Sequence, residues 1–214
     1  MEPSNPEISK QNKQQVWENK RKEIDEIKDA LGMGIDEKIK DTIVALNVLG
    51  INTVASCEGH TDENRGLPYP WIDFASPNEP LKFEGEKEIY EKTAESYGIP
   101  VTDIIPPVKN LEVFNEALFK ASQNKITTEW QDWEKENEKL NHKINSYLSD
   151  FYSNRETPNE IRINIEHIAP GLRRIQSGDI EVDKPEDELK ELISKRQIEM
   201  ENFTEFLKNK FFQS

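Results

Sequence analysis

The sequence predicts an α+β fold in which a small, mostly antiparallel sheet is flanked by long amphipathic helices. Several segments repeat apolar residues at intervals of three and four, which is the pattern of amphipathic helices. Shorter segments, bounded by turn residues, alternate apolar and polar side chains or form short apolar runs, as strands do. The longest helical patterns lie near 109–152 and 185–212. They are separated by a short segment with strand character, so helices and strands belong to the same fold.

Composition and charge exclude several classes of protein. The 214-residue chain has one cysteine, so it has neither an intrachain disulfide nor a multi-cysteine zinc module. Its net charge of −14 argues against nucleic acid and anionic membranes as partners, because like charges repel at long range. No apolar run approaches the roughly 20 residues of a membrane span, and the polar N-terminal stretch is unlike a signal peptide. We expect a cytoplasmic protein without a membrane partner.

The chain is predicted to form one α+β domain, 13–214, preceded by a loose arm, 1–12. The arm is polar and contains two prolines. A first helix follows the arm, and a second is predicted over 36–49. In this second helix Asp36 has the character of an N-cap, and Gly50 has the character of a C-terminal stop.

The predicted strands lie in two pairs far apart in the sequence. The first two flank a polar, proline-bearing loop and are predicted to pair antiparallel. The last two are separated by the turn residues Pro170 and Gly171. If all of them join one sheet, His167 and Arg173 come within reach of Cys57. The predicted strand ranges are 51–57, 71–75, 161–168 and 172–175.

The remaining segments are predicted to be helical. One helix covers 84–97, and a C-terminal helix begins near Pro185. The stretch 109–152 is expected to break near 125–127, because Thr128 to Gln131 fits a capping box.

The turn after the first strand, Cys57-Glu58-Gly59-His60, gathers the residue types that carry chemistry. A positive φ at Gly59 would let His60 return toward the thiol, and a functional thiolate would show a lowered pKa. Four explanations stay open for Cys57. They are packing as a small apolar side chain, ligand binding, nucleophilic catalysis with His60, and metal binding.

Metal binding needs more ligands than this turn supplies. A catalytic zinc site has three protein ligands and one open position. Asp62, Asp73 or His167 are the residues that would complete such a set. Because nothing in the spacing demands it, no metal is predicted, and the cofactor is left open.

The leading hypothesis is a pocket for a small anionic ligand, such as a phosphate or carboxylate, covered by the loop from Arg65 to Trp71. Arginine forks bind such groups in a bidentate manner, whereas pairing with surface carboxylates is the alternative role for them. Tyr69 and Trp71 are either a stacking platform or a hydrophobic lid. The predicted catalytic residues are Cys57 and His60, and the predicted ligand-binding residues are Glu58, Gly59, Arg65, Tyr69, Trp71, Asp73, His167, Arg173 and Arg174.

Two further functions stay open from the sequence. One is a Cys/His- or metal-dependent enzyme that acts on a nucleotide or nucleic acid. The other is an interaction protein whose acidic long helices bind a basic partner, in which case the turn at Cys57 is purely structural.

The stretch 35–74 resembles a loosely related set of uncharacterised bacterial and phage proteins. These carry Gly-Ile/Tyr-x-Thr in a strand, then Ser/Cys-Cys-x-Gly-His, and then a strand that ends in an aromatic residue. Here Gly50-Ile51-Asn52-Thr53 and Ser56-Cys57-Glu58-Gly59-His60 match that pattern, and Pro70-Trp71-Ile72-Asp73-Phe74 follows.

The same stretch is similar to the wybutosine-synthesis methyltransferase family of archaea and eukaryotes. That family carries an acidic helix start, a Leu-Asn near the helix end and then Thr-x-Ser-Cys-Ser-Gly-Arg, and its members act on tRNA with S-adenosylmethionine. Asp36, Leu46-Asn47 and Ser56-Cys57 match together with Gly59, whereas Glu58 replaces a serine and His60 replaces the arginine. The resemblance covers about a fifth of the chain and implies a shared local α-β-β unit.

Overall fold

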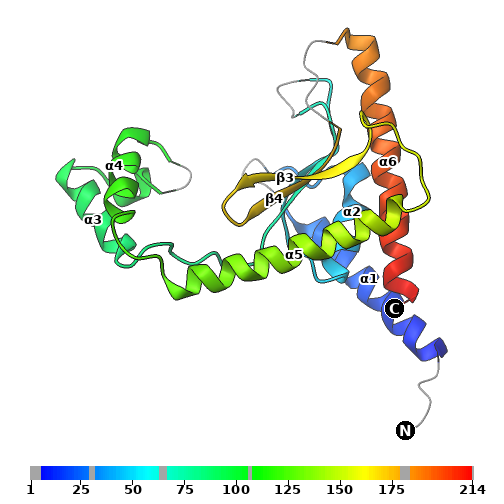
Figure 1. Cartoon of the computed structure of the whole chain (residues 1–214), viewed down its shortest axis with the longest axis horizontal. Coiled ribbons are helices and arrows are strands. Elements are labelled where there is room, and N and C mark those ends of the chain that lie inside the picture. Colours follow the sequence, from blue (N-terminus) through cyan, green and yellow to red (C-terminus); the bar gives the residue numbers. More distant parts are fainter. Residues whose placement is uncertain (1–5, 29–31, 63–66, 106–107, 179–183, 214) are drawn as a thin grey trace. The chain divides into compact units, whose positions relative to one another are not determined.

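The computed structural model describes residues 6–28, 32–62, 67–105, 108–178 and 184–213 (Figure 1). The chain forms two compact units, of which the first comprises Met1–Ser76 and Asn137–Ser214 and the second Pro77–Glu136. The single α+β domain over 13–214 stays a prediction. The second unit buries a small apolar cluster of its own, made of Tyr90, Ala94, Ile104, Val113, Ala117 and Ala121.

The first unit contains the sheet and most of the helical residues. The elements confirm the predicted α+β class and the predicted strand positions to within two residues. The first unit holds α1 (Pro6–Glu26), α2 (Glu37–Val48), β1 (Thr53–Cys57), β2 (Trp71–Phe74), β3 (Ile163–Ala169), β4 (Leu172–Ser177) and α6 (Glu186–Gln213).

The second unit is helical. It contains α3 and α4, joined through a short 3-10 turn, and α5 begins in it and ends in the first unit. The bounds are α3 (Glu86–Ser96), the turn Val101–Asp103, α4 (Leu111–Ala121) and α5 (Thr128–Tyr152).

The sheet has four strands in the order β1-β2-β4-β3, and every neighbouring pair is antiparallel. The predicted pairing of β1 with β2 is therefore confirmed, and β4 joins it from far away in the sequence. Successive residues of a strand point to opposite faces, so each row of paired residues belongs to one face. One row is Ser56, Ile72, Ile175 and Ile165, and the next is Cys57, Trp71, Gln176 and Asn164.

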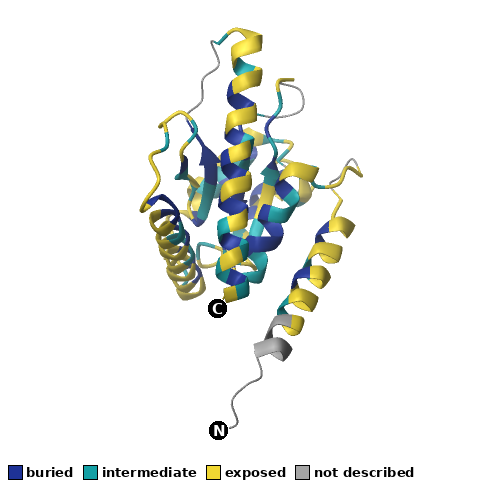
Figure 2. Cartoon of the chain, turned by 90° about the vertical axis from the view of Figure 1, so that its right-hand side faces the viewer, coloured by how far each residue is buried: buried dark blue, intermediate teal, exposed yellow. Residues whose placement is uncertain are grey.

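The apolar face of the sheet packs against helices to form the main core. Ile72 and Ile175 contribute from the strands, and Leu46 of α2 and Phe203 of α6 cover them. All four side chains are fully shielded from water. Figure 2 shows that buried and exposed residues alternate along α6, as expected for a helix with one face on the core.

Two helix starts differ from the sequence prediction. Helix α1 begins at Pro6 and so includes part of the expected loose arm, since proline is well accommodated in the first turn of a helix. At the start of α5 the predicted break is present, but Thr127 provides the cap instead of Thr128. Its hydroxyl accepts the Trp130 N–H at 3.1 Å. Among the described helices, none combines the length and apolar character needed to cross a membrane.

Candidate metal centre

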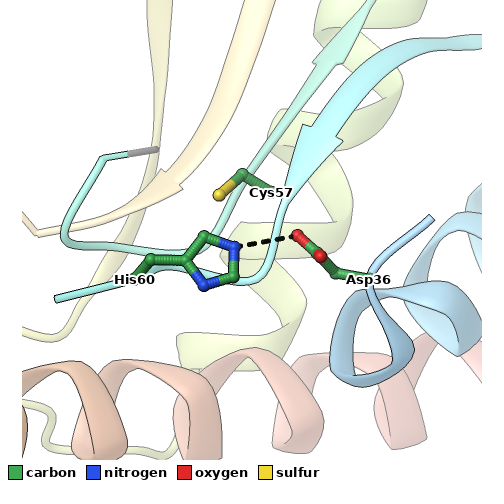
Figure 3. Close-up of side chains that lie close together, drawn as sticks. All are labelled: Asp36, Cys57 and His60. Carbon is green, nitrogen blue, oxygen red and sulfur yellow. Dashed lines mark hydrogen bonds and ion pairs between the residues drawn. The ribbon is translucent and has the colours of Figure 1, made fainter. Parts of the chain in front are cut away.

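Three side chains from separate positions converge at the end of β1 (Figure 3). Asp36 immediately precedes α2, Cys57 ends β1, and His60 follows the turn. A ligand atom from each lies within 4.8 Å of the other two. Cys57 is only 5% exposed, and the His60 side chain is 9% exposed. A shielded sulfur and a shielded nitrogen donor thus meet the oxygen donor of Asp36, whose side chain is 27% exposed.

Asp36 takes part in this cluster instead of capping α2. Its side chain makes no cap hydrogen bond to the helix. One carboxylate oxygen, Oδ2, accepts the Glu58 N–H at 3.1 Å and lies 3.3 Å from His60 Nε2. The Glu58 carboxylate takes over the capping role, because it accepts the Lys38 N–H at 3.1 Å. The start of α2 and the end of β1 therefore brace each other.

Gly59 makes the turn that returns His60 to the thiol. Its φ of +87° confirms the predicted left-handed conformation, which side chains with a Cβ disfavour. A Cβ at this position would lie 2.8 Å from the Tyr69 carbonyl carbon. The His60 N–H donates to the Leu67 carbonyl at 3.1 Å, which holds the residues after the turn in place.

A side chain of α6 supports the turn from the outside. Gln197 Nε2 donates to the Glu58 carbonyl at 2.9 Å, and its Oε1 accepts from Lys38 Nζ at 2.8 Å. Gln197 links α2, the turn and α6 in this way. Sequence patterns give no signal for this role, because a glutamine on a polar helix face is commonplace.

The surroundings of Cys57 favour its protonated form. Burial raises the pKa of the thiol, and the nearby carboxylates of Asp36 and Glu58 raise it further, against a lowering contribution from the Gly59 N–H. This direction is opposite to the lowered pKa that a functional thiolate would show. A cation at the cluster would reverse this balance, because it would stabilise the thiolate.

We expect slow alkylation of Cys57 by iodoacetamide in the metal-free protein, with an apparent pKa above the free value of about 8.5. Asp36→Asn should lower that apparent pKa, because it removes a nearby negative charge while keeping the shape of the side chain. The measurement is a pH–rate profile for each protein, with urea-unfolded protein as the reference. A folded-state pKa below the unfolded value would contradict this electrostatic account.

Arg173 and Arg174 do not form the joint anion clamp that the sequence suggests. They are consecutive residues of β4, so their side chains leave opposite faces of the sheet. Arg174 makes two hydrogen bonds to Asp73, at 2.6 and 2.9 Å. Arg173 bonds to Glu138 of α5 at 2.7 Å. Pairing with carboxylates, the alternative role given above, is what the structure shows for both.

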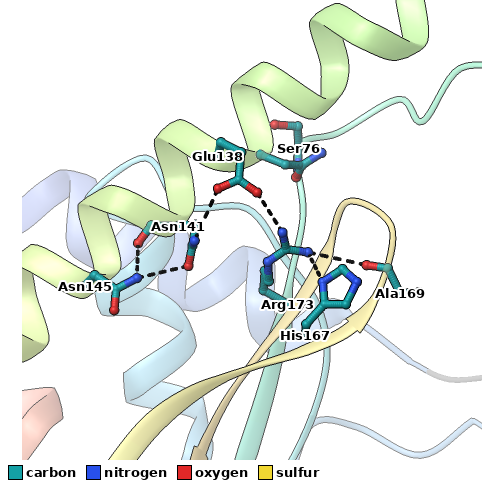
Figure 4. Close-up of polar contacts among 8 residues, drawn as sticks. Ser76, Glu138, Asn141, Asn145, His167, Ala169 and Arg173 are labelled. Carbon is teal, nitrogen blue, oxygen red and sulfur yellow. Dashed lines mark hydrogen bonds and ion pairs between the residues drawn. The ribbon is translucent and has the colours of Figure 1, made fainter.

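His167 belongs to the Arg173 network and lies outside the Cys57 cluster (Figure 4). Arg173 donates to His167 Nδ1, which therefore acts as an acceptor. Within the described ranges, the cluster at Cys57 includes neither His167 nor Asp62 nor Asp73. The third donor that the sequence left open is Asp36.

The two aromatic residues of the predicted platform have different surroundings. Tyr69 is 1% exposed and therefore acts as a buried packing residue. The Arg174 guanidinium lies 3.9 Å from the centroid of the Trp71 ring and so occupies one face of that ring. Arg65, the remaining predicted ligand residue, lies outside the described residues.

Comparisons with protein families, with curated proteins and with solved structures found no match to this chain. The similarity of 35–74 to the methyltransferase family and to the bacterial and phage set therefore stays a prediction.

Proposed function

We propose that Asp36, Cys57 and His60 bind one divalent metal ion of the zinc class. The observation that carries this proposal is the convergence of three different donor types within 4.8 Å at a largely buried place. Thiolate, imidazole and carboxylate are the three protein ligand types of zinc. A tetrahedral zinc ion places its donor atoms about 3.5 Å apart, so side-chain movements of about an ångström close the set.

Three protein ligands leave the fourth position of a tetrahedral ion open. Structural zinc sites are closed by four protein ligands, whereas catalytic sites keep one position for water or substrate. An ion held here would act as a Lewis acid and would lower the pKa of a water in that position. The metal-dependent enzyme is therefore the function that this geometry supports best, and hydrolytic chemistry is the class we assign to it.

Binding of the ion and release of the thiol proton are coupled. Because the thiol pKa is raised in the metal-free protein, Cys57 is protonated near neutral pH and must lose its proton to coordinate the metal. Proton and metal compete for the same sulfur. Below the thiol pKa, raising the pH therefore strengthens metal binding.

We expect zinc affinity to rise by about tenfold per pH unit between about pH 7 and 8 from the thiol alone. Competition titrations against a chromophoric chelator measure this affinity, and calorimetry in buffers of different ionisation enthalpy counts the released protons. Absence of stoichiometric zinc binding would overturn the proposal. An affinity that does not change with pH would remove Cys57 from the ligand set.

A bound metal ion would also decide whether an anionic ligand can bind at this turn. In the metal-free protein the carboxylates of Asp36 and Glu58 lie beside Cys57 and oppose an anion there. A bound divalent cation would make the same place attractive to a phosphate or carboxylate. We therefore still predict anion binding at this turn, but only when the metal ion is bound.

The cluster of Asp36, Cys57 and His60 also bears on the interaction-protein and nucleic-acid hypotheses. A purely structural turn, as the interaction-protein hypothesis requires, accounts for the hydrogen bonds of Asp36 but does not need a thiol beside them. The cytoplasm remains our proposal for localisation, because a thiolate ligand must stay reduced. A nucleic-acid substrate is opposed by the net charge of −14.

A further inference from the structure

Strand β1 is an edge of the sheet, and it ends at the metal cluster. It pairs with β2 on one side. Within the described ranges, no strand or isolated bridge pairs with its other side. Val54 is 59% exposed, and Ala55 is exposed beside it. The outer side of β1, which we call the β1 edge, therefore has no described strand beside it.

The β1 edge is protected by its shortness and by the register shift between Thr53 and Ala55, but not by charge or proline. Exposed edges are usually shielded by charged side chains or proline, since their free backbone groups otherwise recruit another strand. Thr53 to Cys57 contains neither a charged residue nor a proline. The opposite edge strand, β3, carries Glu166. The β3 edge is thus protected by a charged side chain, whereas the β1 edge is not.

We infer that the β1 edge binds an extended, positively charged peptide segment of a partner protein and leads it past the Asp36–Cys57–His60 cluster. This deepens the proposed function, on which it rests for the role of the metal, by naming an extended peptide as the substrate class. Free N–H and C=O groups along a strand are complementary to another extended backbone, which joins the sheet as an additional strand. Because Cys57 is the last residue of β1, a segment paired along the edge reaches the metal position.

Charge selects a basic peptide over a second copy of this chain. Two copies carry a net charge of −14 each and repel at long range. Asp36 lies at the end of the edge, and the Glu58 carboxylate lies beside it. Asp36 is neutralised when it holds the metal, whereas the Glu58 carboxylate keeps its charge and, together with the net charge of −14, attracts the cationic side chains of a basic segment.

Both edge strands contain an irregularity that provides a matched pair of positions. The register of β1 shifts between Thr53 and Ala55, and the register of β3 shifts between His167 and Ala169. Each irregularity holds one exposed β-branched residue, Val54 at 59% and Ile168 at 44%. Proline is tolerated at edges and bulges but removes a backbone donor. V54P and I168P therefore alter the two edges in the same way.

The first test uses the unaltered protein and a fluorescent peptide of alternating lysine and valine, observed by fluorescence anisotropy. We expect at least about tenfold weaker binding when the amides along one edge of the peptide are N-methylated, because strand addition needs them. The same peptide with glutamate in place of lysine should bind at least about tenfold more weakly at low salt. Equal binding of the methylated and unmodified peptides would overturn the inference, whatever the variants show.

The second test uses the two proline variants, each checked for fold by circular dichroism and for its metal site by zinc titration. V54P should weaken peptide binding by about tenfold or more, and I168P should leave it within about twofold. Equal losses in both variants would contradict a site at the β1 edge. Sedimentation equilibrium gives the remaining outcome, since a dimer that only V54P abolishes would assign the edge to a second copy and overturn the peptide partner.

Peptide and metal binding are measured separately, so their failures can be told apart. Peptide binding to zinc-free protein, together with no zinc binding, would overturn the metal site alone. Zinc binding without peptide binding would overturn the β1 edge as a binding site and leave the metal site intact.

Discussion

Replacing Cys57 with serine should weaken zinc binding by at least about 100-fold. The two side chains have nearly the same shape, so the fold is kept, but a serine hydroxyl does not ionise near neutral pH and is a poor zinc ligand. His60→Ala should have an effect of similar size. Competition titrations at constant pH measure both losses, and circular dichroism confirms that the variants are folded.

A second histidine serves as the control for this experiment. His142 is exposed on α5, so His142→Ala should leave zinc affinity unchanged. Asp36→Asn keeps the shape of the third ligand while removing its charge, and we expect about a 10–100-fold loss. Equal affinities of Cys57→Ser and the unaltered protein would show that zinc binds elsewhere on the chain.

Gly59→Ala should destabilise the first unit by about 2–4 kcal/mol. About 1 kcal/mol comes from the left-handed backbone, and about 1–3 kcal/mol comes from overlap of the new Cβ with the backbone of Tyr69. Urea unfolding followed by circular dichroism measures the loss. The surviving folded protein should also bind zinc more weakly, since the overlap displaces the turn that holds His60.

Gly50 offers a matched control in the same unit. Its φ of +76° is similar, but the nearest atom to an added Cβ is the flexible Lys143 Nζ at 3.7 Å. Gly50→Ala should therefore cost only about 1 kcal/mol. Equal destabilisation by the two substitutions would mean that the close approach of Gly59 to Tyr69 has no energetic importance.

The sheet and the turn were predictable from local patterns. Alternation located β1 and β2, and the polar loop between them indicated an antiparallel pair, which the register of Cys57 with Trp71 confirms. The glycine in Cys57–His60 indicated the positive φ that the structure has. These features depend on neighbours in the chain, which is why sequence patterns reveal them.

The third member of the cluster was not predictable in the same way. Asp36 has the residue type and position of a helix cap, so its presence needed no other explanation. Only the tertiary approach of β1 to the start of α2 turns its carboxylate toward His60. Gln197 is missed for the same reason, because its partners lie on another part of the chain.

The separate pairing of Arg173 and Arg174 has a reason that the sequence already contained. Arg173 and Arg174 are adjacent in a predicted strand, and adjacent strand residues point to opposite faces. Their carboxylate partners, Glu138 and Asp73, come from different elements. The division into two units was hidden as well, since α5 continues without a break from one unit into the other.

Cobalt(II) occupies zinc sites and reports its ligands by absorption, so titrating it into the metal-free protein tests for the metal centre itself. We predict saturation at one equivalent, the visible bands of a four-coordinate ion, and a near-ultraviolet charge-transfer band from the Cys57 thiolate that is absent in Cys57→Ser. A titration that gives no thiolate band, or the same spectrum for both proteins, would contradict a metal centre at Asp36, Cys57 and His60.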